Sequence, residues 1–125
     1  MDKCRPEQME ALAQHLRMLS HPVRLRSLAL LLSAGGGLCV CELADVLELP
    51  QYTVSRHLQA LARAGWVVGE HDGPWVYYKP VTSPLLKALG PSLSPAVEDE
   101  ERLRERLLLR ERGRCVVGPK DTGRA

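Results

Sequence analysis

Apolar residues recur every three or four positions along much of the chain, which is the spacing of helices that bury one face. This spacing predicts a first helix over about residues 6–19, with Pro6 as its first helical residue. A second helix follows, with Ser20 as its cap and Pro22 in its first turn, and the three glycines at 35–37 end it. Its candidate core residues are Val23, Leu25, Leu28, Leu31 and Leu32.

Two further helical patterns lie close together, at residues 40–47 and 51–64, with only residues 48–50 between them. A short helix, a tight turn and a longer helix form the helix-turn-helix arrangement. Gly65 occupies the position where a left-handed C-terminal cap is expected. The residues expected to face the core are Leu43, Val46, Leu47, Leu49, Val54, Leu58 and Leu61.

The next segment has the pattern of a β-hairpin. Aromatic and β-branched residues at 66–71 and 74–80 flank Asp72-Gly73, a dipeptide suited to a tight turn. A hairpin that directly follows the second helix of a helix-turn-helix is a wing. We therefore predict a mainly α fold with a small β-hairpin wing, a winged helix-turn-helix.

Two more helices are expected toward the C-terminus, a short one from Ser83 and a longer one from Ser94 to about Arg112. The longer one has acids early and arginines late, which complements its dipole. It is either a solvated helix or a partner surface formed by Leu103, Leu107 and Leu108. We expect a DNA-binding and dimerisation domain at residues 1–92, followed by a C-terminal helix and flexible tail at 93–125.

Composition limits the class of protein. With 125 residues, 45% of them hydrophobic and 26% charged, the chain is expected to form one small domain. It contains no Phe, so aliphatic side chains must fill the core, and dimerisation would bury more apolar surface. No apolar run is long enough for a membrane span, and the N-terminus has no apolar signal core, so we predict a cytoplasmic protein.

The net charge of +2 alone does not indicate a nucleic-acid partner, but residues 51–68 contain cations and no acid. The outer surface of the helix at 51–64 carries side chains that can bond bases or phosphates. These candidate DNA-binding residues are Gln51, Tyr52, Thr53, Ser55, Arg56 and Gln59. A polar face alone equally fits a solvated helix, but the short helix before it and the hairpin after it favour double-stranded DNA.

Three motifs carry a family resemblance: "LSHPVRLRSLALLL", "LPQYTVSRHLQALARAGWV" and "GPWVYYKP". Their order and spacing resemble those of the ArsR/SmtB family of winged helix-turn-helix metal-sensing repressors, over about residues 10–90. The resemblance implies a homodimer that binds an inverted-repeat operator in its own promoter. It also implies DNA contacts from Gln51, Thr53, Ser55 and Arg56, with His57 packed beneath the recognition helix.

Cys39 and Cys41 stand one residue apart where the helix at 40–47 begins. Thiolates select soft ions, and a helix N-terminus favours the thiolate form. Residues i and i+2 of a regular helix point about 200° apart, so both sulfurs can reach one ion only if the first turn is absent or unwinds. We therefore expect ion binding to compete with the helix start and to oppose DNA binding.

The segment "GLCVCEL" resembles the family motif Glu-Leu-Cys-Val-Cys-Asp-Leu, which implies an effector site at Cys39 and Cys41. Arsenic repressors often carry another cysteine where this chain has Ala44. Cys4, which resembles the N-terminal ligand of cadmium and lead sensors, and Cys115 are the candidates for a third thiolate. Three thiolates suit As(III) or Sb(III) as the inducer, and Cd(II), Pb(II) or Zn(II) are the alternatives.

A redox-sensing repressor of the same fold is another alternative. A disulfide between Cys39 and Cys41 would close a small strained ring, so Cys4 with Cys115, or a bond between subunits, is the better pair. An enzyme is not predicted, because the chain has no Cys-x-x-Cys and no loop that could cradle an oxyanion.

Overall fold

The computed structural model describes residues 5–116, so Cys4 and residues 117–125 lie outside the described part of the chain. The elements in chain order are α1 (Pro6–Arg17), α2 (Pro22–Ala34), β1 (Leu38–Cys39), α3 (Val40–Leu47), α4 (Gln51–Arg63), β2 (Val67–Asp72), β3 (Trp75–Pro80), α5 (Pro84–Leu89), the 3-10 turn η1 (Gly90–Ser92) and α6 (Val97–Leu107). The predicted mainly α fold with a β-hairpin wing is confirmed.

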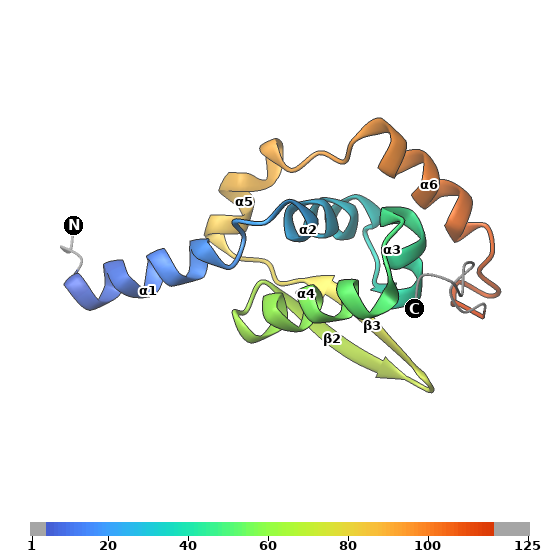
Figure 1. The fold of residues 1–125 in the computed structure, drawn as a ribbon, viewed down its shortest axis with the longest axis horizontal. Helices are drawn as coiled ribbons and strands as arrows, with labels where there is room; N and C mark the ends of the chain where they lie inside the picture. The colour runs from blue at the N-terminus through green and yellow to red at the C-terminus, as the bar shows by residue number, and fades with distance from the viewer. Residues whose placement is uncertain (1–4, 117–125) are drawn as a thin grey trace.

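Helix α2 lies at the centre of the molecule, with α4 on one side and α6 on the other (Figure 1). Four consecutive α2 residues, Leu28 to Leu31, are all buried, because α3, α4, α6 and β3 surround this helix. The spacing of apolar residues along α2 therefore does not identify one buried face of this helix. Leu28 and Leu31 are buried as predicted, whereas Val23 and Leu32 are only partly buried and Leu25 is 38% exposed.

The cap of α2 is His21, not the predicted Ser20. The imidazole Nδ1 of His21 accepts a hydrogen bond from the Val23 backbone N–H at 3.2 Å, and Pro22 lacks an N–H to satisfy. Helices α3 and α4 have the bounds predicted for the helix-turn-helix to within one residue. Their predicted core residues are buried, except for Leu49, which packs partly exposed against the core.

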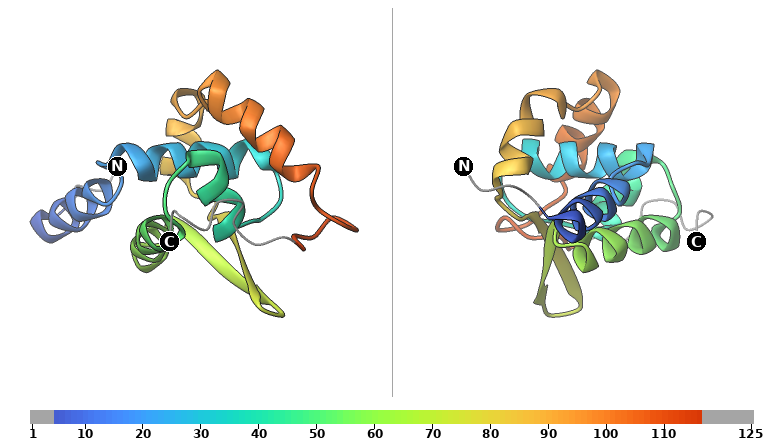
Figure 2. Two further views of the ribbon diagram at one scale, coloured as in Figure 1. Left: turned by 45° about the vertical axis from the view of Figure 1, so that its right-hand side comes forward. Right: turned by 90° about the vertical axis from the view of Figure 1, so that its left-hand side faces the viewer.

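The wing is part of a three-stranded antiparallel sheet in the order β1-β3-β2, and it extends away from the helices (Figure 2). Its two-residue turn is Gly73-Pro74, one residue later than predicted, and Gly73 has a φ of 61°. Strand β1 was not predicted. It pairs with β3 so that Cys39 lies opposite Tyr77 and Leu38 opposite Tyr78.

Helix α6 ends at Leu107, about five residues earlier than predicted. The chain then turns back, and Arg112 and Gly113 both have positive φ angles, which a continuing helix would not allow. Leu103 is buried and Leu107 partly buried against the core of the same chain, so of the three leucines considered as a partner surface only Leu108 is largely exposed, at 80%. The domain boundary at residue 92 stays a prediction.

Helix α1 projects from the rest of the molecule (Figure 1), and none of its residues is buried. Met9, Leu12 and Leu16 are each between 40% and 47% exposed. The predicted apolar face therefore exists but is uncovered in the single chain. None of the described helices has both the length and the apolar character that crossing a membrane requires.

Candidate functional site

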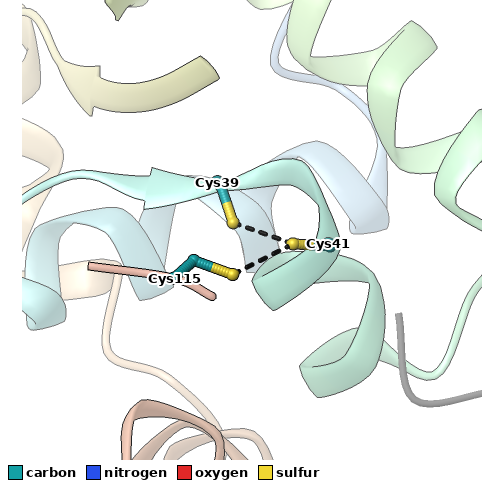
Figure 3. Close-up of side chains that lie close together, drawn as sticks. All are labelled: Cys39, Cys41 and Cys115. Atoms are coloured by element: carbon teal, nitrogen blue, oxygen red, sulfur yellow. Dashed lines mark hydrogen bonds between the residues drawn. The ribbon is translucent and has the colours of Figure 1, made fainter. Parts of the chain in front are cut away.

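Three cysteine thiols meet between β1, α3 and the segment that follows α6. Figure 3 shows Cys39 at the end of β1 and Cys115 on the returning chain, both pointing toward Cys41 in the first turn of α3. The Sγ of Cys41 lies 3.0 Å from the Sγ of Cys39 and 3.4 Å from that of Cys115, and all three sulfurs lie within 4.8 Å of one another. None of the three residues is more than 2% exposed.

The backbone at Cys39 explains why a pair separated by one residue can converge. Cys39 is the N-cap of α3, with an extended conformation (φ −85°, ψ 165°), and the helix begins only at Val40. Pairing of β1 with β3 holds Cys39 extended. Of the two conditions expected for the sulfurs to meet, an absent or an unwound first turn, the structure shows the first, because the helix does not include Cys39. The two sulfurs meet without any unwinding of α3, so the expected competition between ion binding and the helix start is not needed.

Hydrogen bonds from two of its residues, Cys115 and Arg110, hold the Cys115 segment in place. The Cys115 backbone N–H donates a hydrogen bond to the Tyr77 hydroxyl at 2.8 Å. Arg110 donates to both carboxylate oxygens of Glu42, at 2.6 and 2.7 Å, and to the carbonyl oxygen of Gly37 at 2.7 Å. Glu42 in turn accepts the backbone N–H of Cys39 at 3.0 Å. The segment that carries Cys115 is thereby connected to both other cysteines.

A buried ion pair borders the thiols on the other side. The Arg106 Nε donates to Asp45 at 2.7 Å, and both side chains are at most 4% exposed. The Arg106 Nη2 lies 3.6 Å from the Cys115 Sγ and 3.8 Å from the Cys41 Sγ. The Arg106 guanidinium therefore contacts two of the three sulfurs.

The environment also sets the protonation of the neighbouring groups. The hydrogen bond to Cys41, followed by burial and the nearby Glu42 carboxylate, raises the pKa of Cys39, so this thiol is neutral in the ion-free protein. Binding of a thiophilic ion would therefore release its proton. Burial raises the pKa of Glu42, but the hydrogen bonds from Arg110 and from the Cys39 N–H outweigh burial and lower it overall.

The sulfur positions can be compared with what a bound ion requires. Metal–sulfur bonds of about 2.3 Å with bond angles of roughly 90° to 110° place neighbouring sulfurs about 3.3 to 3.8 Å apart. The separations of 3.0 and 3.4 Å around Cys41 are close to this range. Within residues 5–116 this trio is the one cluster of potential ligands, and all its donors are sulfur, which fits a soft ion.

The predicted DNA-binding residues lie along the outside of α4. Gln51, Tyr52, Arg56 and Gln59 are exposed, and Thr53 and Ser55 are half-buried. Two pairs contact each other along the helix. The Arg56 Nη1 donates to the Tyr52 hydroxyl at 3.2 Å, and the Gln59 Nε2 donates to the Ser55 Oγ at 3.4 Å.

His57 points toward α2 rather than outward. It is half-buried, and its Nδ1 accepts a hydrogen bond from the Arg24 Nε at 3.0 Å. Burial lowers the pKa of His57, and the nearby His21 and Arg24 lower it further. A neutral acceptor that links α4 to α2 agrees with the expected packing role.

Sequence reasoning missed four residues that border the thiol cluster, namely Glu42, Tyr77, Arg106 and Arg110. Arg106 and Arg110 stand four residues apart, so their side chains lie on the same side of the chain where it leaves α6. In the sequence, the arginines of this segment indicate only a favourable interaction with the helix dipole.

Comparison with known proteins gives consistent matches. Residues 19–69 match the family model of a helix-turn-helix domain. The arsenic resistance transcriptional regulator ArsR1 of Pseudomonas putida is 42% identical over 74 residues, which is 52% of this chain and 58% of that protein. The HTH-type transcriptional repressor SmtB of Mycobacterium tuberculosis is 37% identical over 93 residues, which is 74% of this chain and 67% of that protein.

A solved structure is also similar. The crystal structure of the AntR antimony-specific transcriptional repressor matches with a TM-score of 0.63 and 28% sequence identity, over 74% of this chain and 83% of that chain. All three of these proteins are named as transcriptional regulators or repressors, which confirms the prediction of a regulator and not an enzyme.

Proposed function

Since the chain belongs to the ArsR/SmtB family of winged helix-turn-helix transcriptional repressors, we propose that As(III) or Sb(III) binds Cys39, Cys41 and Cys115 and releases the protein from its operator. The observation that carries this proposal is the convergence of three buried sulfurs from β1, α3 and the segment after α6.

The choice of ion rests on the number and kind of donors. Three sulfurs suit the three-coordinate pyramidal geometry of As(III) and Sb(III), whereas zinc sites are almost always four-coordinate. Two of the relatives are named for arsenic resistance and for antimony. Cd(II) or Zn(II) would need a further ligand from outside the trio, and Cys4 lies outside the described residues.

A thiol-redox response is the second candidate, favoured by the 3.4 Å between the sulfurs of Cys41 and Cys115. Hydrogen peroxide could oxidise these two thiols to one disulfide, with the two thiol protons and the peroxide leaving as two waters. Mass spectrometry after mild peroxide treatment tests this candidate. Absence of a Cys41–Cys115 disulfide, together with unchanged operator binding, removes it.

The ligand acts on DNA binding through α3. An ion bonded to three sulfurs joins β1, the first turn of α3 and the Cys115 segment into one unit, and α3 packs directly against the recognition helix α4. The ion-bound arrangement holds α3 in a position that does not support the DNA-bound position of α4. Inducer and operator then favour different conformers, so each weakens the binding of the other.

Two copies of the chain bind the operator together. The uncovered apolar face of α1, with Met9, Leu12 and Leu16, packs against a second copy. Dimers of this type bind two half-sites about 34 to 36 Å apart, so the operator is an inverted repeat. A repressor must share a compartment with the DNA that it binds. The predicted cytoplasmic location is therefore part of this proposal.

Fluorescence anisotropy tests the function by measuring operator affinity. The fully reduced protein is titrated into a labelled duplex taken from the DNA that precedes its gene. We expect arsenite to weaken operator binding by about 5- to 150-fold, the range of typical allosteric couplings. Cys41→Ser should bind the operator normally and lose the response, whereas Cys4→Ser should keep it. Equal affinity of the reduced wild type with and without arsenite would contradict the proposal.

A further inference from the structure

A cavity of about 350 Å³ opens beside the recognition helix, between α2 and α4. The residues that line it are Arg24 from α2 and Tyr52, Thr53, Arg56, His57, Ala60 and Arg63 from α4. Three of the seven are arginines and none is acidic. The cavity therefore has the lining of an anion site on the face of the protein that carries the predicted DNA-binding residues.

No carboxylate within residues 5–116 neutralises these three arginines. Arg24 donates to two neutral acceptors, the Nδ1 of His57 and the carbonyl oxygen of Met18, both at 3.0 Å. Arg56 donates to the neutral Tyr52 hydroxyl. Arg63 is exposed and makes no ion pair with any described residue. Elsewhere in the described chain, Arg26, Arg102, Arg106, Arg110 and Arg114 are each paired with an acid.

The position of Arg63 along α4 fits a backbone contact. Tyr52, Arg56, Gln59 and Arg63 follow one another at spacings of four, three and four residues, so they share one face of the helix. Eleven residues separate Tyr52 from Arg63, which is about 16 Å at 1.5 Å per residue. The major groove is only about 12 Å wide. When the N-terminal turns of α4 contact bases, its C-terminal end lies over the flanking strand.

We propose that Arg24 and Arg63, with Arg56 between them, bind a phosphodiester group of the DNA backbone beside the bases that α4 contacts. This inference rests on the proposed DNA-binding function. The guanidinium groups match phosphate oxygens in charge and geometry. A contact of this kind positions the protein and adds affinity, but carries no sequence information.

The test measures how binding depends on salt. Anisotropy titrations over a series of KCl concentrations are made with the operator duplex and with a scrambled duplex of equal length. Loss of one phosphate contact lowers the magnitude of the slope of log K against log salt by about 0.9 for each bound subunit. At 0.1 M salt this corresponds to about an eightfold loss of affinity per subunit.

Arg63→Gln is the main variant, because Arg63 is exposed and its loss leaves no buried partner. We expect it to weaken binding to both duplexes by the same factor and to reduce the slope. The matched control is Arg104→Gln, which removes the same charge from an exposed position on α6, on the far side of α2 from α4. The control should keep the wild-type slope and affinity.

Arg24→Gln should reduce the slope in the same way, and Arg24→Lys should restore it, since a phosphate contact needs the charge. A purely packing role of Arg24, through His57 and Met18, would leave the slope unchanged in Arg24→Gln. An unchanged slope in Arg63→Gln, or a loss confined to the operator duplex, would overturn the phosphate site. Failure of the wild type to bind the operator more tightly than the scrambled duplex would instead count against the proposed function.

Discussion

Replacing Arg110 with methionine removes the side chain that connects the Cys115 segment to α3. The Arg110 guanidinium donates to both oxygens of Glu42 and to the Gly37 carbonyl oxygen. Methionine preserves much of the apolar stem but offers no donor. The Glu42 side chain is 0% exposed, so its carboxylate would keep only its hydrogen bonds with Cys39, among them the one from the backbone N–H.

The size of the effect follows from this burial. Breaking a buried ion pair by removing one partner typically costs about 3 to 5 kcal/mol, because the other charge is left uncompensated. Arg110 is 18% exposed, so water can partly replace it, and we expect a loss of about 3 kcal/mol. Arg114 provides a matched control in the same segment. Its pair with Asp72 is 60% and 51% exposed, and such surface pairs contribute about 1 kcal/mol or less.

Urea unfolding followed by far-UV circular dichroism measures the difference, at one fixed protein concentration because the proposed dimer would make stability depend on concentration. With a slope of about 2 kcal/mol per molar urea, Arg110→Met should lower the midpoint by about 1.5 M and Arg114→Met by no more than about 0.5 M. Equal midpoints for the two variants would refute the reasoning that Arg110 stabilises the fold through the buried Glu42.

Three further predictions follow from the same structure. Cys115→Ser should weaken arsenite binding by at least about 100-fold, because even residues outside the coordination shell affect metal affinity by up to that factor. Competition with a thiol chelator measures the arsenite affinity, and an undiminished affinity would contradict this prediction. Arg26 foremost, together with Arg102, holds the pKa of Asp99 below its ordinary value, so Asp99 stabilises the fold above about pH 4 and this contribution disappears as the pH falls through the lower folded pKa. Urea unfolding from pH 7 to pH 2 should show that Asp99→Asn lacks this part of the pH dependence, and an unaltered pH profile would disprove it. Leu12→Glu should give monomers in analytical ultracentrifugation, because it places a charge on the uncovered face of α1; a persistent dimer would rule out α1 as the interface.

The helix-turn-helix and the wing could be predicted from the sequence because each is a local pattern. Helical spacing at residues 40–47 and 51–64, and β-branched and aromatic residues around a turn at Gly73, are set by residues close together in the chain. Each of these elements lies within a residue or so of its predicted place. The nature of the protein family followed from the same motifs.

The geometry of the thiol site could not be predicted in this way. The extended conformation of Cys39 comes from the pairing of a two-residue strand with Tyr77, nearly forty residues later. The capping residue of α3 is also a cysteine, which is not among the usual cap residues, although Glu42 three positions on completes a capping box. Without β1, the sequence leaves open whether the first turn of the helix is absent or unwinds at Cys39.

The C-terminal segment shows the same limit. The arginines of residues 102–112 have the spacing of a solvated helix, but Arg106 and Arg110 bind acids of α3 that lie 61 and 68 residues earlier in the chain. Pairings over such distances leave no periodic signal. Helix α6 ends at Leu107, and the chain then turns back toward Cys41. Cys115 was one of two equal candidates in the sequence, and only the fold distinguishes it from a residue on a free tail.

X-ray absorption at the arsenic edge tests most directly whether Cys115 completes the inducer site. For arsenite-loaded, fully reduced protein we expect three sulfur neighbours around arsenic in the wild type and in Cys4→Ser. In Cys115→Ser, two sulfurs and one oxygen should remain. Three sulfurs in Cys115→Ser, with one lost in Cys4→Ser, would contradict the proposal and assign the third thiolate to the N-terminal segment.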